Sequence, residues 1–171
     1  LRALGAVVAG DIGCYTLAAT EPLSAMDSTV AMGSSIGMAI GLARSGGAPG
    51  PVVAAIGDST FLHAGMPALA DAAYNGTRMT VLILDNATTA MTGGNVNPGT
   101  GKTVEGKPAR RVELETLCRG LGIEDVVVIP GFDTAAIERE LIRAVPSDEP
   151  SVLIVREPCV LEFKSSTTTV S

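Results

Sequence analysis

The sequence has no tryptophan, three phenylalanines, two tyrosines and one histidine among its 171 residues. A core with so few rings must be built from closely packed aliphatic side chains, and 46% of the residues are hydrophobic. This composition suits a sheet that is buried on both faces. We therefore expect an α/β fold: a doubly wound, mostly parallel sheet with helices on both faces.

Cysteine is also scarce. Cys14, Cys118 and Cys159 are widely spaced and odd in number, which argues against a disulfide framework and a zinc site and favours a reducing cytoplasm. No apolar run approaches the roughly 20 residues that a membrane span needs, and no signal peptide is visible. Because the chain begins at Leu1 without a methionine, we expect it to be a piece of something longer.

Positive charge is limited as well, with 12 Lys and Arg against 18 Asp and Glu and a net charge of −6. No basic stripe is available to neutralise the phosphates of a nucleic acid, so we expect no nucleic-acid partner. A phosphorylated ligand would have to be held by a metal ion and by backbone N–H groups.

Two aliphatic runs organise what is present. Residues 52–56 lead into Gly57-Asp58, and residues 80–84 lead into Asp85-Asn86. The residues between them predict a loop, a helix and a return strand. A right-handed strand-helix-strand unit brings the carboxyl ends of its two parallel strands side by side. Asp58 and Asn86 are therefore expected to face each other across a crevice.

Carboxylate and amide oxygens are the ligands that Mg²⁺ prefers where the ion also holds phosphate. Gly57 lets the backbone come close to a ligand, and Ser59 and Thr60 are placed to offer N–H groups to an anion. The plainer interpretation is that Asp58 only forms a turn or caps a helix. Its pairing with Asn86 favours a metal-diphosphate site.

Gly-Asp followed by Asn at the next strand end resembles the thiamine diphosphate motif. The longer strings Gly-Asp-Ser-Thr-Phe-Leu-His-Ala-Gly (57–65) and Leu-Asp-Asn-Ala-Thr-Thr-Ala-Met-Thr-Gly (84–93) are similar to the 2-oxoacid:ferredoxin oxidoreductases. Within that family they most resemble the thiamine-binding domain of the indolepyruvate ferredoxin oxidoreductase α subunit. The resemblance covers nearly the whole chain, from residues 10–17 to residues 156–159.

This resemblance implies that Mg²⁺ is held by the side chains of Asp58 and Asn86 and by the carbonyl of Thr88. Residues 87–103 have no hydrophobic period and are expected to form a loop that follows the diphosphate. Thr89, Met91 and Thr92 would line the cofactor or substrate. At 94–95 this chain has Gly-Asn where relatives carry Gly-Gln or His-Gln, which puts contacts beyond the diphosphate in doubt.

The residues before the central unit are expected to reach the same site. Residues 5–10 predict a buried strand that ends at the same edge of the sheet, which places Gly13 and Cys14 near the cofactor. Cys14 is either such a contact or a small buried hydrophobe. Residues 31–43 predict a helix whose start, at Gly33 and Ser34, would offer N–H groups to the diphosphate.

Glycines at 33, 37 and 41 predict a smooth stripe on that helix for close packing of another backbone. Just before it, Met32 resembles the large apolar residue that wedges beneath the cofactor in thiamine enzymes and brings base and reacting carbon together. An ordinary core methionine is the alternative.

His63 is expected in a loop, where it is either structural or faces the substrate and relays a proton. The remaining elements are predicted as scaffold: helices at 66–75, 114–121 and after an N-cap at Asp133, and strands at 126–129 and 151–155. Cys118 is assigned to the core. We expect one diphosphate-binding domain, residues 1–163, and a disordered tail, residues 164–171.

Two parts of a thiamine enzyme are missing from this sequence. No Glu sits in a motif that would activate the cofactor's pyrimidine, and no cysteine cluster is present to hold 4Fe-4S clusters. The resemblance therefore implies an oligomeric enzyme in which a pyrimidine-binding domain or subunit and a ferredoxin-like cluster domain lie elsewhere.

The implied reaction is oxidative decarboxylation of an indolepyruvate-like 2-oxoacid to an acyl-coenzyme A, with electrons passed to ferredoxin. One alternative is a subunit of a non-oxidative 2-oxoacid decarboxylase of the sulfopyruvate or phosphonopyruvate type. Another is a non-catalytic module that binds nucleotide diphosphates.

Overall fold

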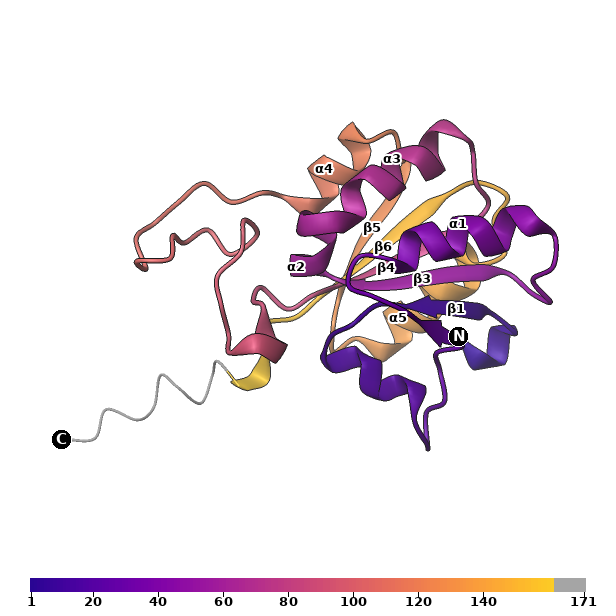
Figure 1. The fold of residues 1–171 in the computed structure, drawn as a ribbon, viewed down its shortest axis with the longest axis horizontal. Helices are drawn as coiled ribbons and strands as arrows, with labels where there is room; N and C mark the ends of the chain where they lie inside the picture. Colours follow the sequence, from indigo (N-terminus) through magenta and orange to yellow (C-terminus); the bar gives the residue numbers. More distant parts are fainter. Residues whose placement is uncertain (162–171) are drawn as a thin grey trace.

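Six parallel strands form the centre of the molecule, in the order β2-β1-β3-β4-β6-β5 (Figure 1). The computed structural model describes residues 1–161, so the predicted tail, residues 164–171, lies outside the described residues. The strands are β1 (Val7–Gly10), β2 (Ser28–Thr29), β3 (Val52–Gly57), β4 (Thr80–Asp85), β5 (Asp125–Pro130) and β6 (Ser151–Arg156).

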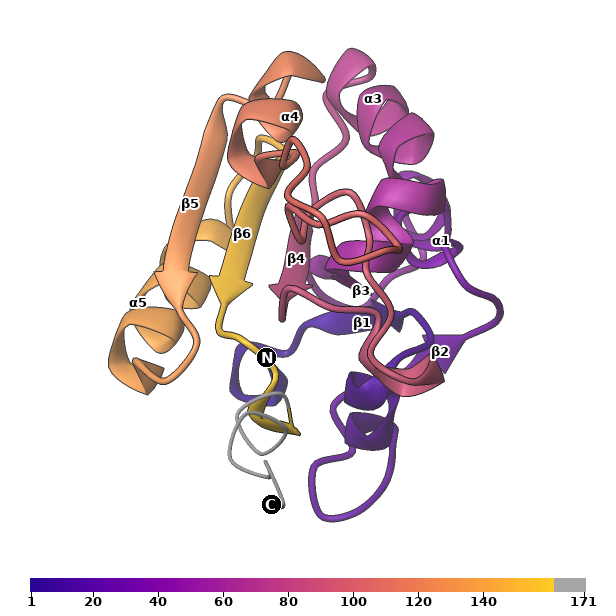
Figure 2. The same ribbon diagram turned by 90° about the vertical axis from the view of Figure 1, so that its left-hand side faces the viewer.

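Helices cover both faces of this sheet, as the composition predicted. The α-helices are α1 (Ser35–Ser45), α2 (Asp58–Thr60), α3 (Met66–Tyr74), α4 (Leu114–Gly120) and α5 (Thr134–Ala144). A π-helical turn, Phe61–Gly65, joins α2 to α3, and short 3-10 helices span Arg2–Leu4, Cys14–Ala19 and Ala90–Thr92. Figure 2 shows α1, α3 and α4 on one side of the sheet and α5 on the other.

The central strands form because their side chains are aliphatic on both faces. In β3 the first five residues are buried, and β4 and β6 begin with four buried residues each. Alternate residues face two separate cores, one beneath α1, α3 and α4 and the other beneath α5. Cys118 is fully buried in the first core, as predicted.

The first third of the chain differs from the prediction at three points. The first strand begins at Val7 because a 3-10 helix ends at Gly5, which has a left-handed backbone with φ of 63°. The first long helix begins at Ser35 because Gly33 has φ of 86°, outside the helical region. The two-residue strand β2 was not predicted, since nothing in its sequence distinguishes it from a loop.

The predicted packing stripe on α1 is wrong for two of its three glycines. Gly37 and Gly41 are exposed, and a Cβ at either position would meet nothing within 4 Å in the described part of the chain. Gly33 does serve close packing, since its Cβ would lie 2.4 Å from the Cβ of Ala64 in the π-helical turn.

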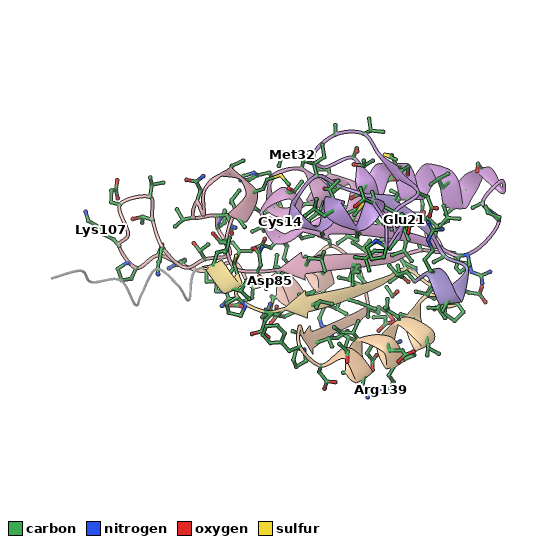
Figure 3. The ribbon with its side chains drawn as sticks, turned by 90° about the horizontal axis from the view of Figure 1, so that it is seen from below. Cys14, Glu21, Met32, Asp85, Lys107 and Arg139 are labelled. Atoms are coloured by element: carbon green, nitrogen blue, oxygen red, sulfur yellow. The ribbon has the colours of Figure 1, made fainter. Side chains whose placement is uncertain are left out.

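The carboxyl ends of three adjacent strands place three aspartates along one edge of the sheet. Asp11 follows β1, Asp58 follows β3, and Asp85 ends β4. In Figure 3, Cys14, Met32 and Asp85 lie near this edge, while Lys107 sits on the loop that extends away from it. The order of strands reverses at β1 and β3, which is where open α/β sheets bind ligands.

None of the helices formed by residues 1–161 is long and apolar enough to cross a membrane.

Candidate functional site

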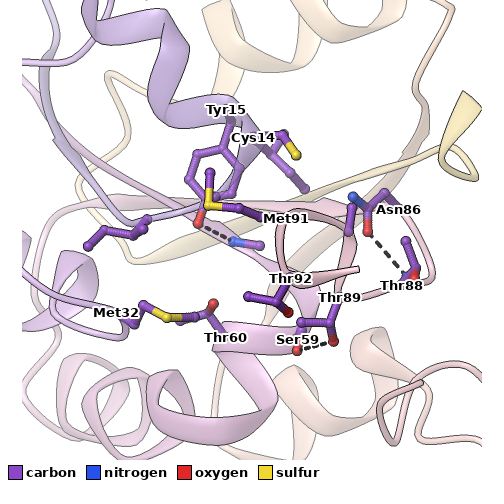
Figure 4. Close-up of a pocket in the computed structure, with 15 residues that line it drawn as sticks. Cys14, Tyr15, Met32, Ser59, Thr60, Asn86, Thr88, Thr89, Met91 and Thr92 are labelled. Atoms are coloured by element: carbon purple, nitrogen blue, oxygen red, sulfur yellow. Dashed lines mark hydrogen bonds between the residues drawn. The ribbon is translucent and has the colours of Figure 1, made fainter. Parts of the chain in front are cut away.

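A pocket lies at this edge, between the loops that follow β1, β3 and β4 (Figure 4). Eleven of the predicted site residues line it: Gly13, Cys14, Met32, Gly57, Ser59, Thr60, Asn86, Thr88, Thr89, Met91 and Thr92. Four predicted residues do not line it: Gly33, Ser34, Asp58 and His63. Residues from four separate segments are therefore brought together around one opening.

Asp58 lies between two residues that line this pocket, Gly57 and Ser59, at the point where β3 turns into α2. It is only 3% exposed, and among residues 1–161 it forms no ion pair within 4.0 Å. Its Oδ2 accepts one side-chain hydrogen bond, from Nδ2 of Asn97 at 3.4 Å. Burial raises the pKa of the Asp58 carboxyl to about 6, and the negative charge of Asp85 adds to this effect. The site thus contains a buried carboxylate without a built-in counter-charge.

The oxygen donors around Asp58 fit a small divalent cation. The register pairs Gly57 of β3 with Leu84 of β4, so Asp58 and Asn86 follow neighbouring strands. Oδ1 of Asn86 accepts the N–H of Thr88 at 3.2 Å and keeps a second lone pair. Residues 1–161 contain no cluster of three or more His, Cys, Asp or Glu side chains suited to a metal. A hard cation held by one carboxylate, one amide oxygen and carbonyl oxygens is the type that these donors suit.

The start of the helical segment after β3 contains the two residues that were predicted to offer N–H groups to an anion. Ser59 and Thr60 lie in the first turn, where backbone N–H groups have no partner within the helix. Oγ of Ser59 lies 2.7 Å from Oγ1 of Thr89, which ties this turn to the loop after β4 (Figure 4). The π-helical turn that follows is an uncommon feature that often marks functional sites.

The prediction that His63 lies in a loop is wrong, because the segment stays helical from Asp58 to Tyr74. His63 belongs to the π-helical turn and is exposed. It lies outside the lining of the pocket.

The prediction that the start of α1 offers free N–H groups to a diphosphate is also wrong. The carboxylate of the fully buried Asp11 accepts the N–H of Gly33 at 2.8 Å and the N–H of Ser35 at 3.1 Å. The N–H of Ser34 bonds to the carbonyl of Ala31. Because these donors already have partners, Gly33 and Ser34 shape the helix start rather than offer hydrogen bonds.

The apolar side of the pocket is formed by exposed methionines. Met32 and Met91 are each 54% exposed, so the alternative of a core methionine at 32 is wrong. Cys14 is exposed too, which overturns its interpretation as a small buried hydrophobe. These three side chains leave apolar surface open at the mouth of the pocket.

Sequence reasoning missed several residues of this site, and three of them make hydrogen bonds that shape it. Tyr15 lines the pocket and accepts the N–H of Gly57 at 2.9 Å, and burial raises the pKa of its hydroxyl, which keeps it protonated. Asn97 bonds to Asp58, and Asp11 anchors α1. Only Asp11 had a usable signal, its place directly after a predicted strand.

Solved structures share this architecture. A 2-oxoglutarate:ferredoxin oxidoreductase from Magnetococcus marinus matches with a TM-score of 0.79 and 18% identity, over 93% of this chain and 56% of that chain. A thiamine diphosphate-dependent 4-hydroxybenzoylformate decarboxylase from Rhodococcus jostii RHA1 matches with a TM-score of 0.64 and 20% identity, over 90% of this chain and 29% of that chain. At such identities the likeness establishes the fold, and it confirms the predicted α/β class.

Curated sequences are closer. The indolepyruvate oxidoreductase subunit IorA of Pyrococcus horikoshii is 40% identical over 168 residues, covering 91% of this chain and 26% of that protein. The subunit of the same name from Archaeoglobus fulgidus is 42% identical over 156 residues, covering 91% and 25%. The chain thus spans about a quarter of the length of the curated relatives it matches.

The profile described as "Thiamine pyrophosphate enzyme, C-terminal TPP binding domain" matches residues 11–155, which include all three strand ends of the pocket. Thiamine pyrophosphate is another name for thiamine diphosphate, so the match agrees with the resemblance seen in the sequence. The chain belongs to the family of C-terminal TPP-binding domains of thiamine pyrophosphate enzymes.

Proposed function

We propose that this chain is the diphosphate-binding half of the active site in a 2-oxoacid:ferredoxin oxidoreductase that acts on arylpyruvates such as indolepyruvate. The observation that carries the proposal is Asp58, a buried carboxylate with no ion-pair partner among residues 1–161, at the end of the strand that neighbours the one leading into Asn86. The names of the relatives from Pyrococcus and Archaeoglobus support the choice of an oxidoreductase and of the substrate.

Each group at the pocket has a role in this proposal. Asp58, Asn86 and the carbonyl of Thr88 hold Mg²⁺, and the ion neutralises the charge of the diphosphate. Backbone N–H groups at Ser59 and Thr60 bind phosphate oxygens at the start of the helical segment. Asp58 has no ion-pair partner within residues 1–161, which supports the metal, because an unpaired buried charge is costly.

When bound, thiamine diphosphate supplies the electron sink that allows a 2-oxoacid to lose CO₂. The chain's own residues position the reacting end of the cofactor and shield it from water. Met32 and Met91 give the apolar walls, which exclude water and hold the ring system in place. Cys14 and Thr92 complete the rim, and His63 is placed outside it, so its role as a proton relay requires contact with a partner domain.

The rest of the active site would come from other parts of the enzyme. A pyrimidine-binding domain would supply the activating Glu, a cluster domain would carry the 4Fe-4S centres, and coenzyme A and ferredoxin would complete the reaction. Large exposed hydrophobic side chains support a docked partner domain. Met32 and Met91 line the pocket, and Leu17 (73% exposed) and Val30 (72%) are each two residues in sequence from a lining residue. The three cysteines are all free, which supports the expectation of a reducing cytoplasm.

The test is calorimetric titration of the enzyme that contains this chain with thiamine diphosphate, with and without Mg²⁺. We expect Mg²⁺-dependent binding in the wild type and a loss of about 100-fold or more in Asp58→Ala, because the metal loses its only carboxylate. Asp71→Asn, an exposed aspartate on α3, is the matched control and should bind like the wild type.

Titration with ADP separates the catalytic proposal from a nucleotide-binding module. Such a module would bind ADP as well as thiamine diphosphate, whereas the proposed domain should bind thiamine diphosphate only. Reduction of ferredoxin in the presence of indolepyruvate and coenzyme A separates it from a non-oxidative decarboxylase. Undiminished Mg²⁺-dependent binding in Asp58→Ala would refute the assignment of the metal site.

A further inference from the structure

Tyr15 joins two of the loops that form the pocket. It lies in the 3-10 helix that follows β1, and its hydroxyl oxygen accepts a hydrogen bond from the N–H of Gly57 at 2.9 Å. The two residues are 42 positions apart in the sequence. Figure 4 shows the hydroxyl of Tyr15 directed at that backbone nitrogen. The bond therefore fixes the backbone one residue before Asp58.

Two glycines make room for this ring. A Cβ at Gly13 would lie 2.4 Å from Cε1 of Tyr15, and a Cβ at Gly57 would lie 3.2 Å from the same atom. The backbone of Gly13 is extended, with φ of 179°, a conformation that any residue adopts. The space that the ring needs, rather than the backbone conformation, explains the glycine at position 13.

We propose that Tyr15 is a positioning residue that holds the Gly57-Asp58 corner in the geometry required for the metal. This inference rests on the proposed function, in which Asp58 binds Mg²⁺. Mg²⁺ demands near-ideal octahedral geometry, so a small displacement of its carboxylate ligand weakens binding. The hydroxyl restrains Gly57, and the ring, packed between the two glycines, keeps the hydroxyl in place.

The test is the Mg²⁺ dependence of thiamine diphosphate binding by the enzyme that contains this chain, measured calorimetrically over a series of Mg²⁺ concentrations. Tyr15→Phe keeps the ring but leaves the Gly57 N–H without its acceptor. We expect the Mg²⁺ concentration for half-maximal binding to rise about tenfold, the size of effect typical of one lost hydrogen bond. The affinity at saturating Mg²⁺ should stay within about twofold, because no direct contact with the cofactor is removed.

Gly13→Ala tests the same connection from the other side. It keeps the hydroxyl, but the new methyl group would displace the ring, so we expect the same shift in Mg²⁺ dependence. Ile129→Val is the control: Ile129 is 2% exposed on β5, which β4 and β6 separate from β3. It weakens the core without touching the pocket, and its Mg²⁺ dependence should match the wild type.

Amide exchange gives a readout that does not involve the cofactor. The N–H of Gly57 should exchange faster in Tyr15→Phe and unchanged in Ile129→Val. Unaltered exchange, or unaltered Mg²⁺ dependence in both pocket variants, would overturn the inference and leave the proposed function standing. A wild-type enzyme without Mg²⁺-dependent binding would overturn the proposed function, and the inference with it.

Discussion

Asp58 and Asp85 occupy neighbouring positions at the edge of the sheet, yet their surroundings differ. Both are buried, at 3% and 4% exposure. Oδ2 of Asp85 lies 2.6 Å from Nε of Arg156, which also bonds to Glu115, whereas Asp58 has an asparagine as its side-chain partner. One carboxylate is neutralised by the chain itself. The other is left for a cation from outside, which is why Asp58 rather than Asp85 is the metal ligand in our proposal.

Asp11 shows a third arrangement at the same edge. It is completely buried and satisfied by backbone N–H groups at the start of α1. Of the three aspartates at three adjacent strand ends, Asp85 thus pairs with a side-chain cation, Asp11 bonds to N–H groups of α1, and Asp58 has an amide but no ion-pair partner within residues 1–161. The comparison indicates that a buried Asp at a strand end becomes a ligand candidate only after its partners are known.

The largest effect on stability is expected from Asp85→Ala. The substitution leaves Arg156 partly buried with Glu115 as its remaining partner, and we expect a loss of about 3 kcal/mol in the free energy of unfolding. Urea denaturation measures it. Asp148→Ala breaks an exposed pair with Arg78 and should cost less than about 0.5 kcal/mol. Equal losses in the two variants would mean that the buried ion pair of Asp85 contributes no more to stability than the exposed pair of Asp148.

Asp58→Asn should increase the free energy of unfolding of the metal-free protein, the opposite of the effect of Asp85→Ala. At pH 8 the wild type carries a buried charge that the variant lacks, so we expect the variant to be about 2 kcal/mol more stable in the presence of a chelator. The folded pKa, about 6, lies above the ordinary value of 3.8, so the native state binds the extra proton between these values. The protonated carboxyl stabilises the folded wild type at low pH, and this contribution to the free energy of unfolding is lost as the pH rises through about 6. The wild type and the variant should therefore be about equally stable at pH 4.

Thermal unfolding of the two proteins at pH 4 and pH 8 measures this difference. A variant that is less stable than the wild type at pH 8 would mean that Asp58 is already neutralised within the chain.

A smaller effect is expected from Asp11→Asn. An amide has one oxygen and accepts fewer of the N–H groups at the start of α1, so we expect a loss of about 1 kcal/mol in chemical denaturation. Asp133→Asn is the matched control, because Asp133 accepts one N–H, from Ala136, and asparagine is a good N-cap. A loss of the same size in Asp133→Asn would mean that the additional N–H groups accepted by Asp11 do not contribute to stability.

The smallest effect is expected from the hydroxyl pair that ties the loop after β4 to α2. Ser59→Ala should cost about 0.5 kcal/mol, and a double-mutant cycle with Thr89→Ala should give a coupling of similar size. A coupling of zero would show that the loop is held by other contacts, such as the bond from Asn97 to Asp58.

The strands and their carboxyl ends could be predicted because their signals are local. The aliphatic runs at 52–56 and 80–84 became β3 and β4 with an error of one residue, and their parallel pairing means that Asp58 and Asn86 follow neighbouring strands. The N-cap at Asp133 was also predicted correctly, since its carboxylate accepts the N–H of Ala136 as the sequence pattern requires.

What the sequence by itself determined was the order of elements, the α/β class and the Gly57-Asp58 and Asp85-Asn86 corners. Tertiary structure alone decided which donors remain free at those corners. The bonds from Gly57 to Tyr15, from Asn97 to Asp58 and from Gly33 to Asp11 span 42, 39 and 22 residues. No local pattern encodes a partner at such a distance, because it depends on how the loops of neighbouring strands meet.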